Sequence, residues 1–257
     1  MANHFPRWSN TLPLQIVAAL GFLAVGVATA VTYYFTPKYT RVGYQPDQPI
    51  PYDHQLHVNQ LGMDCRYCHS FVEDTGHANV PTSQTCWNCH QNVKTDSPLL
   101  EPLRQSIDPN YENYTGEPIR WVKIHATPDY AYFNHSAHVN RGVSCVSCHG
   151  KINEMEVVWH HEPQSMQWCL DCHQNPEEHL RPLDHVTNLD WEASDENRID
   201  FHQYIASKTD EEKAEELVPV EGDAATKELT QEEIGQALKV AWHIMPPSSM
   251  NCAGCHR

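Results

Sequence analysis

The chain has 257 residues and a formal net charge of −16, with 33 acidic against 17 basic side chains. This balance excludes a nucleic-acid-binding surface, because phosphate backbones are bound by basic side chains. An acidic surface could instead dock on a basic protein partner, or it could simply keep the protein soluble. With 18 prolines and 11 glycines, the composition predicts a mainly α fold with short helices and long loops rather than a core built on a sheet.

The first predicted element is a transmembrane helix. Residues 12–34 form a run of 23 residues without charge, long enough to cross a bilayer. Trp8 before it, and Tyr33, Tyr34 and Tyr39 at its end, are typical of the membrane interface. Ala28-Thr29-Ala30 resembles a signal-peptidase site, but the apolar run exceeds the core of a signal peptide. We therefore expect a cytoplasmic N-terminus at 1–11 and a retained anchor at 12–35.

All ten cysteines of the chain fall in five Cys-x-x-Cys-His motifs. This motif attaches haem c through two thioether bonds, and its histidine binds the iron from one face. Zinc sites and disulfide frameworks do not require a histidine directly after every second cysteine. We expect one multihaem cytochrome c domain built around five covalently bound haems c, held by Cys65, Cys68 and His69; Cys86, Cys89 and His90; Cys145, Cys148 and His149; Cys169, Cys172 and His173; and Cys252, Cys255 and His256.

An internal repeat organises the haem region. Residues 53–65 align with residues 134–145 when one gap is allowed, and each copy continues to a second haem motif. Because an internal repeat takes precedence in assigning architecture, we predict a two-haem module at 36–120 and a second at 121–180. Residues 181–257 then hold an acidic segment and the fifth motif.

The acidic segment lies around residues 174–235, with 18 Asp and Glu against five Lys and Arg. Residues 210–216 are typical of a solvated helix face or a mobile loop, and less so of a partner-docking surface. Helical sequence resumes at residues 230–242, where Thr230 and Glu233 have the spacing of a capping box.

The second ligand of each iron decides whether that iron is open to substrate. Thirteen of the 18 histidines lie outside the motifs, enough to close all five irons. Each His-x-x-His pair places two rings on one helical face, and one iron has a single vacant position, so we expect each pair to serve two different haems. His160, His161, His243 and Met250 are reserves, and the predicted distal ligands are His54, His57, His125, His135, His138 and Met166.

The His-x-x-His pattern before a haem motif resembles the small cytochromes of the c7/c3 type. Residues 121–150, followed by 155–158 and 165–169, are more specifically similar to the pentahaem (ActA-type) subunit of alternative complex III. That resemblance implies an electron conduit, without catalysis of its own, in a membrane quinol:acceptor oxidoreductase. Its partners would be polytopic quinol-oxidising and iron–sulfur subunits, and its acceptor a monohaem cytochrome c or a terminal oxidase.

Three other functions remain open. A NapC/NirT-like quinol dehydrogenase places its first haem close to the membrane helix, whereas about 30 residues separate Tyr34 from Cys65 here. A catalytic multihaem reductase needs an open iron, and a free electron carrier needs a cleaved anchor. Since thioether attachment occurs outside the bacterial cytoplasmic membrane, we expect the haem domain on the periplasmic side of that membrane.

Overall fold

The computed structural model describes residues 6–35, 40–193, 198–222, 229–244 and 252–256, so that Tyr39 and Met250 lie outside the described residues. It divides into two compact units, Met1–Val42 and Gly43–Arg257.

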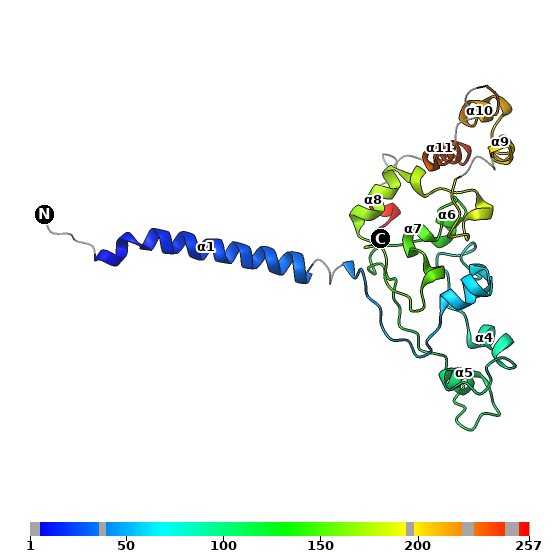
Figure 1. Cartoon of the computed structure of the whole chain (residues 1–257), viewed down its shortest axis with the longest axis horizontal. Coiled ribbons are helices and arrows are strands. Elements are labelled where there is room, and N and C mark those ends of the chain that lie inside the picture. Colours follow the sequence, from blue (N-terminus) through cyan, green and yellow to red (C-terminus); the bar gives the residue numbers. More distant parts are fainter. Residues whose placement is uncertain (1–5, 36–39, 194–197, 223–228, 245–251, 257) are drawn as a thin grey trace. The chain divides into compact units, whose positions relative to one another are not determined.

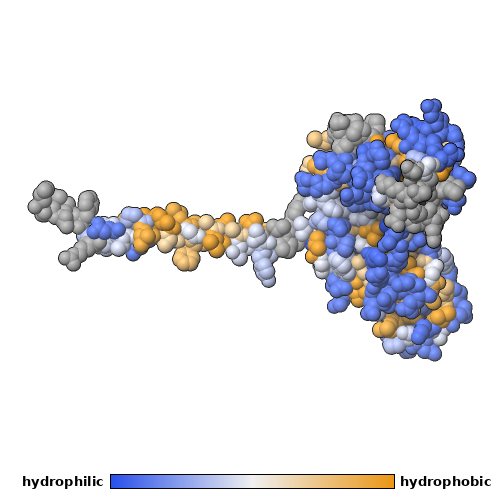
Figure 2. Space-filling model, turned by 45° about the horizontal axis from the view of Figure 1, so that its top comes forward, coloured by the Kyte–Doolittle hydropathy of each residue, from blue (hydrophilic) through white to orange (hydrophobic). Residues whose placement is uncertain are grey.

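The first unit is one long apolar helix. η1 (Arg7–Asn10) leads into α1 (Leu12–Thr29), and η2 (Ala30–Phe35) continues it. The 24 residues Leu12–Phe35 are long and apolar enough to cross a membrane, and apolar side chains cover the visible face of this helix (Figure 2). An exposed helix that is apolar all round is typical of a membrane span. A signal sequence near an N-terminus can pass the same test of length and hydropathy.

The second unit consists of short helices joined by long loops (Figure 1). In the described part of the chain the only β structure is two isolated bridges, between Ala131 and His256 and between Val143 and Leu180. The mainly α prediction is therefore confirmed. Its helices up to residue 185 are η3 (Gln55–Gln60), α3 (Cys65–Cys68), α4 (Ser83–His90), η4 (Pro98–Leu100), α5 (Glu101–Ile107), α6 (His135–Val139), α7 (Val146–His149), η5 (Ile152–Glu154), α8 (Met166–Gln174), η6 (Pro176–His179) and η7 (Leu183–His185).

Few apolar side chains are buried around the haem motifs. Val72, Val139 and Val186 form a small cluster there, while aromatic and aliphatic side chains such as Tyr67 and Phe71 stay about half exposed. This agrees with the expectation that the porphyrins supply much of the missing core.

The C-terminal part differs, because it has an apolar core of its own. α9 (Arg198–Ala206), α10 (Glu211–Leu217) and α11 (Gln231–Ala241) bury side chains such as Ile205, Val218 and Leu238 against one another. Residues 211–217 are thus a helix rather than a loop, with acidic side chains outward and Ala214 buried. The capping box of Thr230 and Glu233 is confirmed. The 3₁₀ turn η11 (Cys252–Gly254) follows.

Candidate haem-binding sites

Each of the five motifs lies on a short helical segment. α3, α4, α7, α8 and η11 carry them in chain order. A helical turn brings residues three apart to the same face, so the two cysteines of each motif point to one side. None of the ten cysteines forms a disulfide. Their thiols are therefore available for thioether bonds.

Backbone carbonyl groups of other residues orient the rings of three motif histidines for metal binding. Nδ1 of His69 is 2.7 Å from the carbonyl oxygen of Asn79, and Nδ1 of His90 is 3.0 Å from that of Val93. Nδ1 of His256 is 3.1 Å from the carbonyl oxygen of Tyr130. An Nδ1–H that donates to a carbonyl fixes the tautomer and leaves Nε2 as the metal ligand.

The same arrangement holds the predicted distal histidines. Nδ1 of His57 is 2.7 Å from the carbonyl oxygen of Asp53, and Nδ1 of His138 is 2.7 Å from that of Asn134. Nδ1 of His135 is 3.0 Å from the carbonyl oxygen of Gly76. These three rings therefore also present Nε2 as the free nitrogen.

Two pairs of rings have the spacing expected for one metal ion between them. The ring centroids of His57 and His90 are 6.3 Å apart, and those of His138 and His173 are 5.9 Å apart. A metal–imidazole bond is about 2 Å long, so a metal bound to Nε2 of both rings sets their centroids about 6 Å apart. In each repeat, the second histidine of the pair thus faces the second motif of its own module.

An aromatic side chain supports each of these distal rings. Tyr52 stacks on His57 at a centroid distance of 4.5 Å, and Phe133 stacks on His138 at 4.4 Å. Sequence reasoning did not assign a role to Tyr52 or Phe133. The repeat alignment held the signal, because both stand two residues before the first histidine of their pair.

A third cluster gathers His125, His149 and His160. The ring centroids of His125 and His149 are 4.4 Å apart, and those of His125 and His160 are 5.0 Å apart. Burial, reinforced by His125 and other nearby histidines, lowers the pKa of His149 to about 3. A neutral imidazole is the form that binds a metal. At 4.4 Å the His125 and His149 rings are too close together to bind one metal from opposite sides, unlike the two pairs above.

The remaining predicted ligands, His54 and Met166, do not face a motif histidine at the spacing of the two pairs above. Burial, then the neighbouring His69 and His57, lower the pKa of His54 to about 4, so this ring is neutral at physiological pH. Met166 is the first residue of α8 and is 63% exposed. Its thioether faces away from the core of the described chain.

Two hollows of mixed lining lie beside the motif helices. One, of about 340 Å³, lies beside α7 and is lined by Val146, Met155 and Trp159 together with the polar Lys151, Glu154 and His161. A second, of about 220 Å³, lies against α8 and is lined by Trp168 and Cys172 and by the polar Asp171, Asn175, Glu178 and His179. Thiols, oriented imidazoles and half-exposed apolar side chains around them are the groups that hold haem c.

Two comparisons with known proteins agree with this chemistry. Residues 131–198 match the family "Cytochrome c7 and related cytochrome c". The chain is also 33% identical, over 132 residues, to the "Menaquinone reductase, multiheme cytochrome c subunit" of Nitratidesulfovibrio vulgaris. That alignment spans 51% of this chain and 59% of the relative. Residues 131–198 are therefore similar to cytochrome c7, and about half of the chain is similar to a multihaem cytochrome c subunit.

Proposed function

We propose that this chain is a membrane-anchored pentahaem cytochrome that conducts electrons within a quinol:acceptor oxidoreductase of the alternative complex III type. The observation that carries the proposal is the paired geometry of His57 with His90 and of His138 with His173. Both pairs close a metal position on two faces. A closed site transfers electrons and does not bind a small substrate.

The ten cysteines would hold the five haems, and the motif histidines would bind the irons. His57 and His138 are placed to serve as second ligands at the second and fourth motifs. His54, His125, His135 and Met166 are four candidates for the three remaining vacant positions. Haem iron would supply one-electron chemistry, whereas a quinol releases two electrons, so several haems in one chain would separate the two electrons.

The chain's own residues keep these sites rigid. The carbonyl groups of Asp53 and Asn134 fix the distal rings through Nδ1. Tyr52 and Phe133 cover one face of those rings. Fixed ligands need little rearrangement when the charge of the iron changes, which favours electron transfer. Quinol chemistry would belong to other subunits, so that this chain is not an enzyme by itself.

The Leu12–Phe35 helix supports membrane attachment in this proposal. With the helix retained, the haem region lies on the periplasmic side of the bacterial cytoplasmic membrane. Its partners are polytopic quinol-oxidising subunits and an iron–sulfur subunit. A monohaem cytochrome c or a terminal oxidase accepts the electrons.

A second candidate reverses the direction of flow. The relative from N. vulgaris is named for menaquinone reduction, in which electrons would pass from a periplasmic donor into the membrane. Both directions need the same closed haems. A NapC/NirT-like quinol dehydrogenase is the third candidate, and it would not require a polytopic partner.

The test is to solubilise membranes in mild detergent, isolate the native assembly through a tag on this chain, and identify its subunits by mass. Stoichiometric polytopic and iron–sulfur subunits support the proposal, and recovery of the chain alone contradicts it. Adding quinol with oxidised cytochrome c, or a reduced periplasmic donor with quinone, to the same preparation separates the two directions. Full-length mass shows whether residues 1–35 are retained.

A further inference from the structure

The order of the haem motifs in space differs from their order in the sequence. We infer that the five motifs, and the haems they hold, form one unbranched chain in the order second, first, third, fourth, fifth. This inference rests on the haem attachment of the proposed function, but on neither the quinol partner nor the direction of flow. Each link is carried by contacts between residues of, or next to, the motifs.

The first link joins the second motif to the first. Asn88 lies inside the second motif, and its Nδ2 is 3.5 Å from the hydroxyl oxygen of Tyr67, which lies inside the first motif. The facing edges of α3 and α4 are therefore neighbours.

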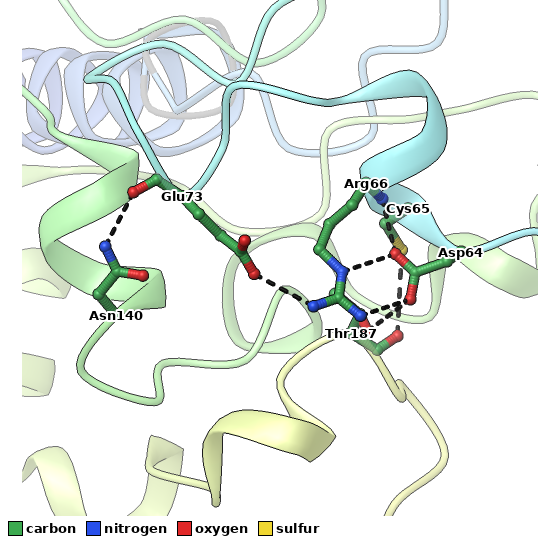
Figure 3. Close-up of polar contacts among 6 residues, drawn as sticks. All are labelled: Asp64, Cys65, Arg66, Glu73, Asn140 and Thr187. Atoms are coloured by element: carbon green, nitrogen blue, oxygen red, sulfur yellow. Dashed lines mark hydrogen bonds and ion pairs between the residues drawn. The ribbon is translucent and has the colours of Figure 1, made fainter.

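The second link joins the first motif to the third, and it is the central one. The residues that directly precede these two motifs are Asp64 and Ser144, and both bind the same two-residue segment. The Thr187 hydroxyl donates to Asp64 at 3.1 Å, and the Ser144 hydroxyl donates to the Val186 carbonyl oxygen at 2.9 Å. Figure 3 shows Thr187 beside Asp64 and Cys65.

The first cysteines of these two motifs meet at this segment. Sγ of Cys65 is 3.9 Å from the Thr187 carbonyl oxygen, and the backbone N–H of Cys145 donates to the Val186 carbonyl. The Cys65 and Cys145 thiols are close enough that each shifts the pKa of the other. A hydrogen bond from the Asn140 side-chain Nδ2 to the Glu73 carbonyl oxygen, at 2.8 Å, also joins the two predicted modules (Figure 3). Equivalent positions of the two repeats thus face one another.

The third link joins the third motif to the fourth. The residues just before the third motif pair with those just after the fourth, through the bridge between Val143 and Leu180 and a 2.8 Å hydrogen bond from the Arg181 N–H to the Gly142 carbonyl. In addition, His138 precedes the third motif by seven residues and faces His173 of the fourth.

The fourth link joins the fourth motif to the fifth. The backbone of the fifth motif pairs with residues 131 and 132, through the bridge between Ala131 and His256 and through the Tyr132 N–H, which donates to the Cys255 carbonyl. Nδ1 of the His256 ring also lies 3.1 Å from the Tyr130 carbonyl oxygen. Phe133 follows that segment and stacks on His138, which faces His173 of the fourth motif. Burial raises the pKa of the Cys169 thiol, and the Cys255 thiolate raises it further.

Exposure of the thiols agrees with this order. Cys89, Cys252 and Cys255 are the exposed cysteines, and the other seven are half-buried. All three exposed thiols belong to the second and fifth motifs, the two ends of the inferred chain. Electrons therefore enter at one of these two motifs and leave at the other, whichever the direction.

The direct test is the set of iron positions in the full-length haem-loaded protein, determined by electron cryo-microscopy of the native assembly or of the isolated chain. We expect the first motif's iron to have those of the second and third motifs as its nearest neighbours, and the fifth motif's iron to lie nearest the fourth. The order would be overturned if the iron of the second motif lay closer to the iron of the third, fourth or fifth motif than to the iron of the first motif.

Two matched variants test the order in solution. His57→Met tags the second-motif haem at one end, and His138→Met tags the fourth-motif haem inside the chain. A histidine-to-methionine change raises the potential of its own iron. In a redox titration followed by electron paramagnetic resonance, we expect His57→Met to shift the potential of one other haem, its single neighbour. We expect His138→Met to shift the potentials of two other haems, its two neighbours.

Equal numbers of shifted neighbours in the two variants would contradict the order. If a variant fails to take up haem, the iron positions of the unmodified chain still decide the question. Neither measurement involves quinol, so a failed order and a failed quinol proposal give different results.

Discussion

The two predicted haem modules arrange their histidines alike but have different surroundings. In the first, His57 faces His90 at 6.3 Å under the ring of Tyr52, and in the second, His138 faces His173 at 5.9 Å under the ring of Phe133. Both distal rings are held by a carbonyl four residues earlier. The repeated sequence therefore orients its ligands by local contacts alone.

The surroundings diverge at a glycine that both repeats place three residues before the first cysteine. Nothing lies within 4 Å of a Cβ built on Gly62. A Cβ on Gly142 would lie 2.3 Å from the Arg181 carbonyl oxygen and 2.4 Å from the Trp242 ring. The end of α11 thus covers the second module at Gly142, whereas no described residue covers the first module at Gly62. Since burial and solvent access tune haem potentials, equal ligands in the two modules do not imply equal potentials.

The largest expected effect comes from removing one distal ring in each module. His57→Ala and His138→Ala each open one iron of five, so about one fifth of the low-spin haem should become high-spin, and about one equivalent of carbon monoxide should bind per reduced chain. Optical and electron paramagnetic resonance spectra of the purified variants measure this. Unchanged spectra in either variant would mean that the ring does not bind iron.

The second prediction concerns the glycine pair. Both residues have a positive φ, 68° at Gly62 and 77° at Gly142, so alanine costs about 1 kcal/mol at each through backbone strain. Gly142→Ala adds the clash with Arg181 and Trp242, for a total of about 3 kcal/mol. Thermal unfolding of the haem-loaded protein should show a clearly larger loss for Gly142→Ala. Equal losses would show that the C-terminal helices do not cover the second module.

Much of the site was predictable because its chemistry lies in contiguous sequence. The five motifs, the His-x-x-His pairs and the module repeat are local patterns, and short helices follow from them. The capping box at Thr230 was predictable for the same reason. The sequence predicted only that the two histidines of each pair serve different haems. It did not predict that His57 faces His90 or that His138 faces His173.

The rest depends on contacts between distant segments. His125 was predicted as a ligand, but its ring lies against His149 and His160, a grouping that no spacing reveals. The sequence did not predict the C-terminal core either. Its buried apolar residues, such as Ile205, Ala214 and Val218, are interspersed with acidic surface residues in the sequence. The average composition of a segment includes the charged side chains of the exposed helix face, whereas only the other face is buried. A strongly acidic composition therefore does not exclude an apolar buried face.

The third prediction compares a haem-free helix with one that carries a motif. Thr230 caps α11, and Ser165 caps α8 by accepting the N–H of Trp168. Losing a cap costs about 1 kcal/mol when packing alone holds the helix. We expect that loss for Thr230→Ala and a smaller one for Ser165→Ala, because two thioether bonds also hold α8. Chemical unfolding followed by circular dichroism measures both, and a larger loss for Ser165→Ala would contradict this reasoning.

The smallest expected effect is an acid dependence of the contact between α11 and η6. Burial raises the pKa of Glu177, but the hydrogen bond from Lys239, a backbone hydrogen bond and the Lys239 charge together outweigh burial and hold that pKa below its ordinary value. A lowered carboxyl pKa stabilises the folded state above the unfolded pKa, and this contribution is lost as pH falls through the folded pKa.

Because solvent screens this pair, we expect its contribution to be about 0.5 kcal/mol at neutral pH. Lys239→Met keeps the aliphatic stem and removes the charge, so it should lower the melting temperature slightly at pH 7 and leave it nearly unchanged at pH 3. The first module has no part in this pair, so the absorption of its haems should not respond at either pH. A Lys239→Met loss that persists at pH 3 would show that packing of the Lys239 stem, and not its charge, holds α11 on η6.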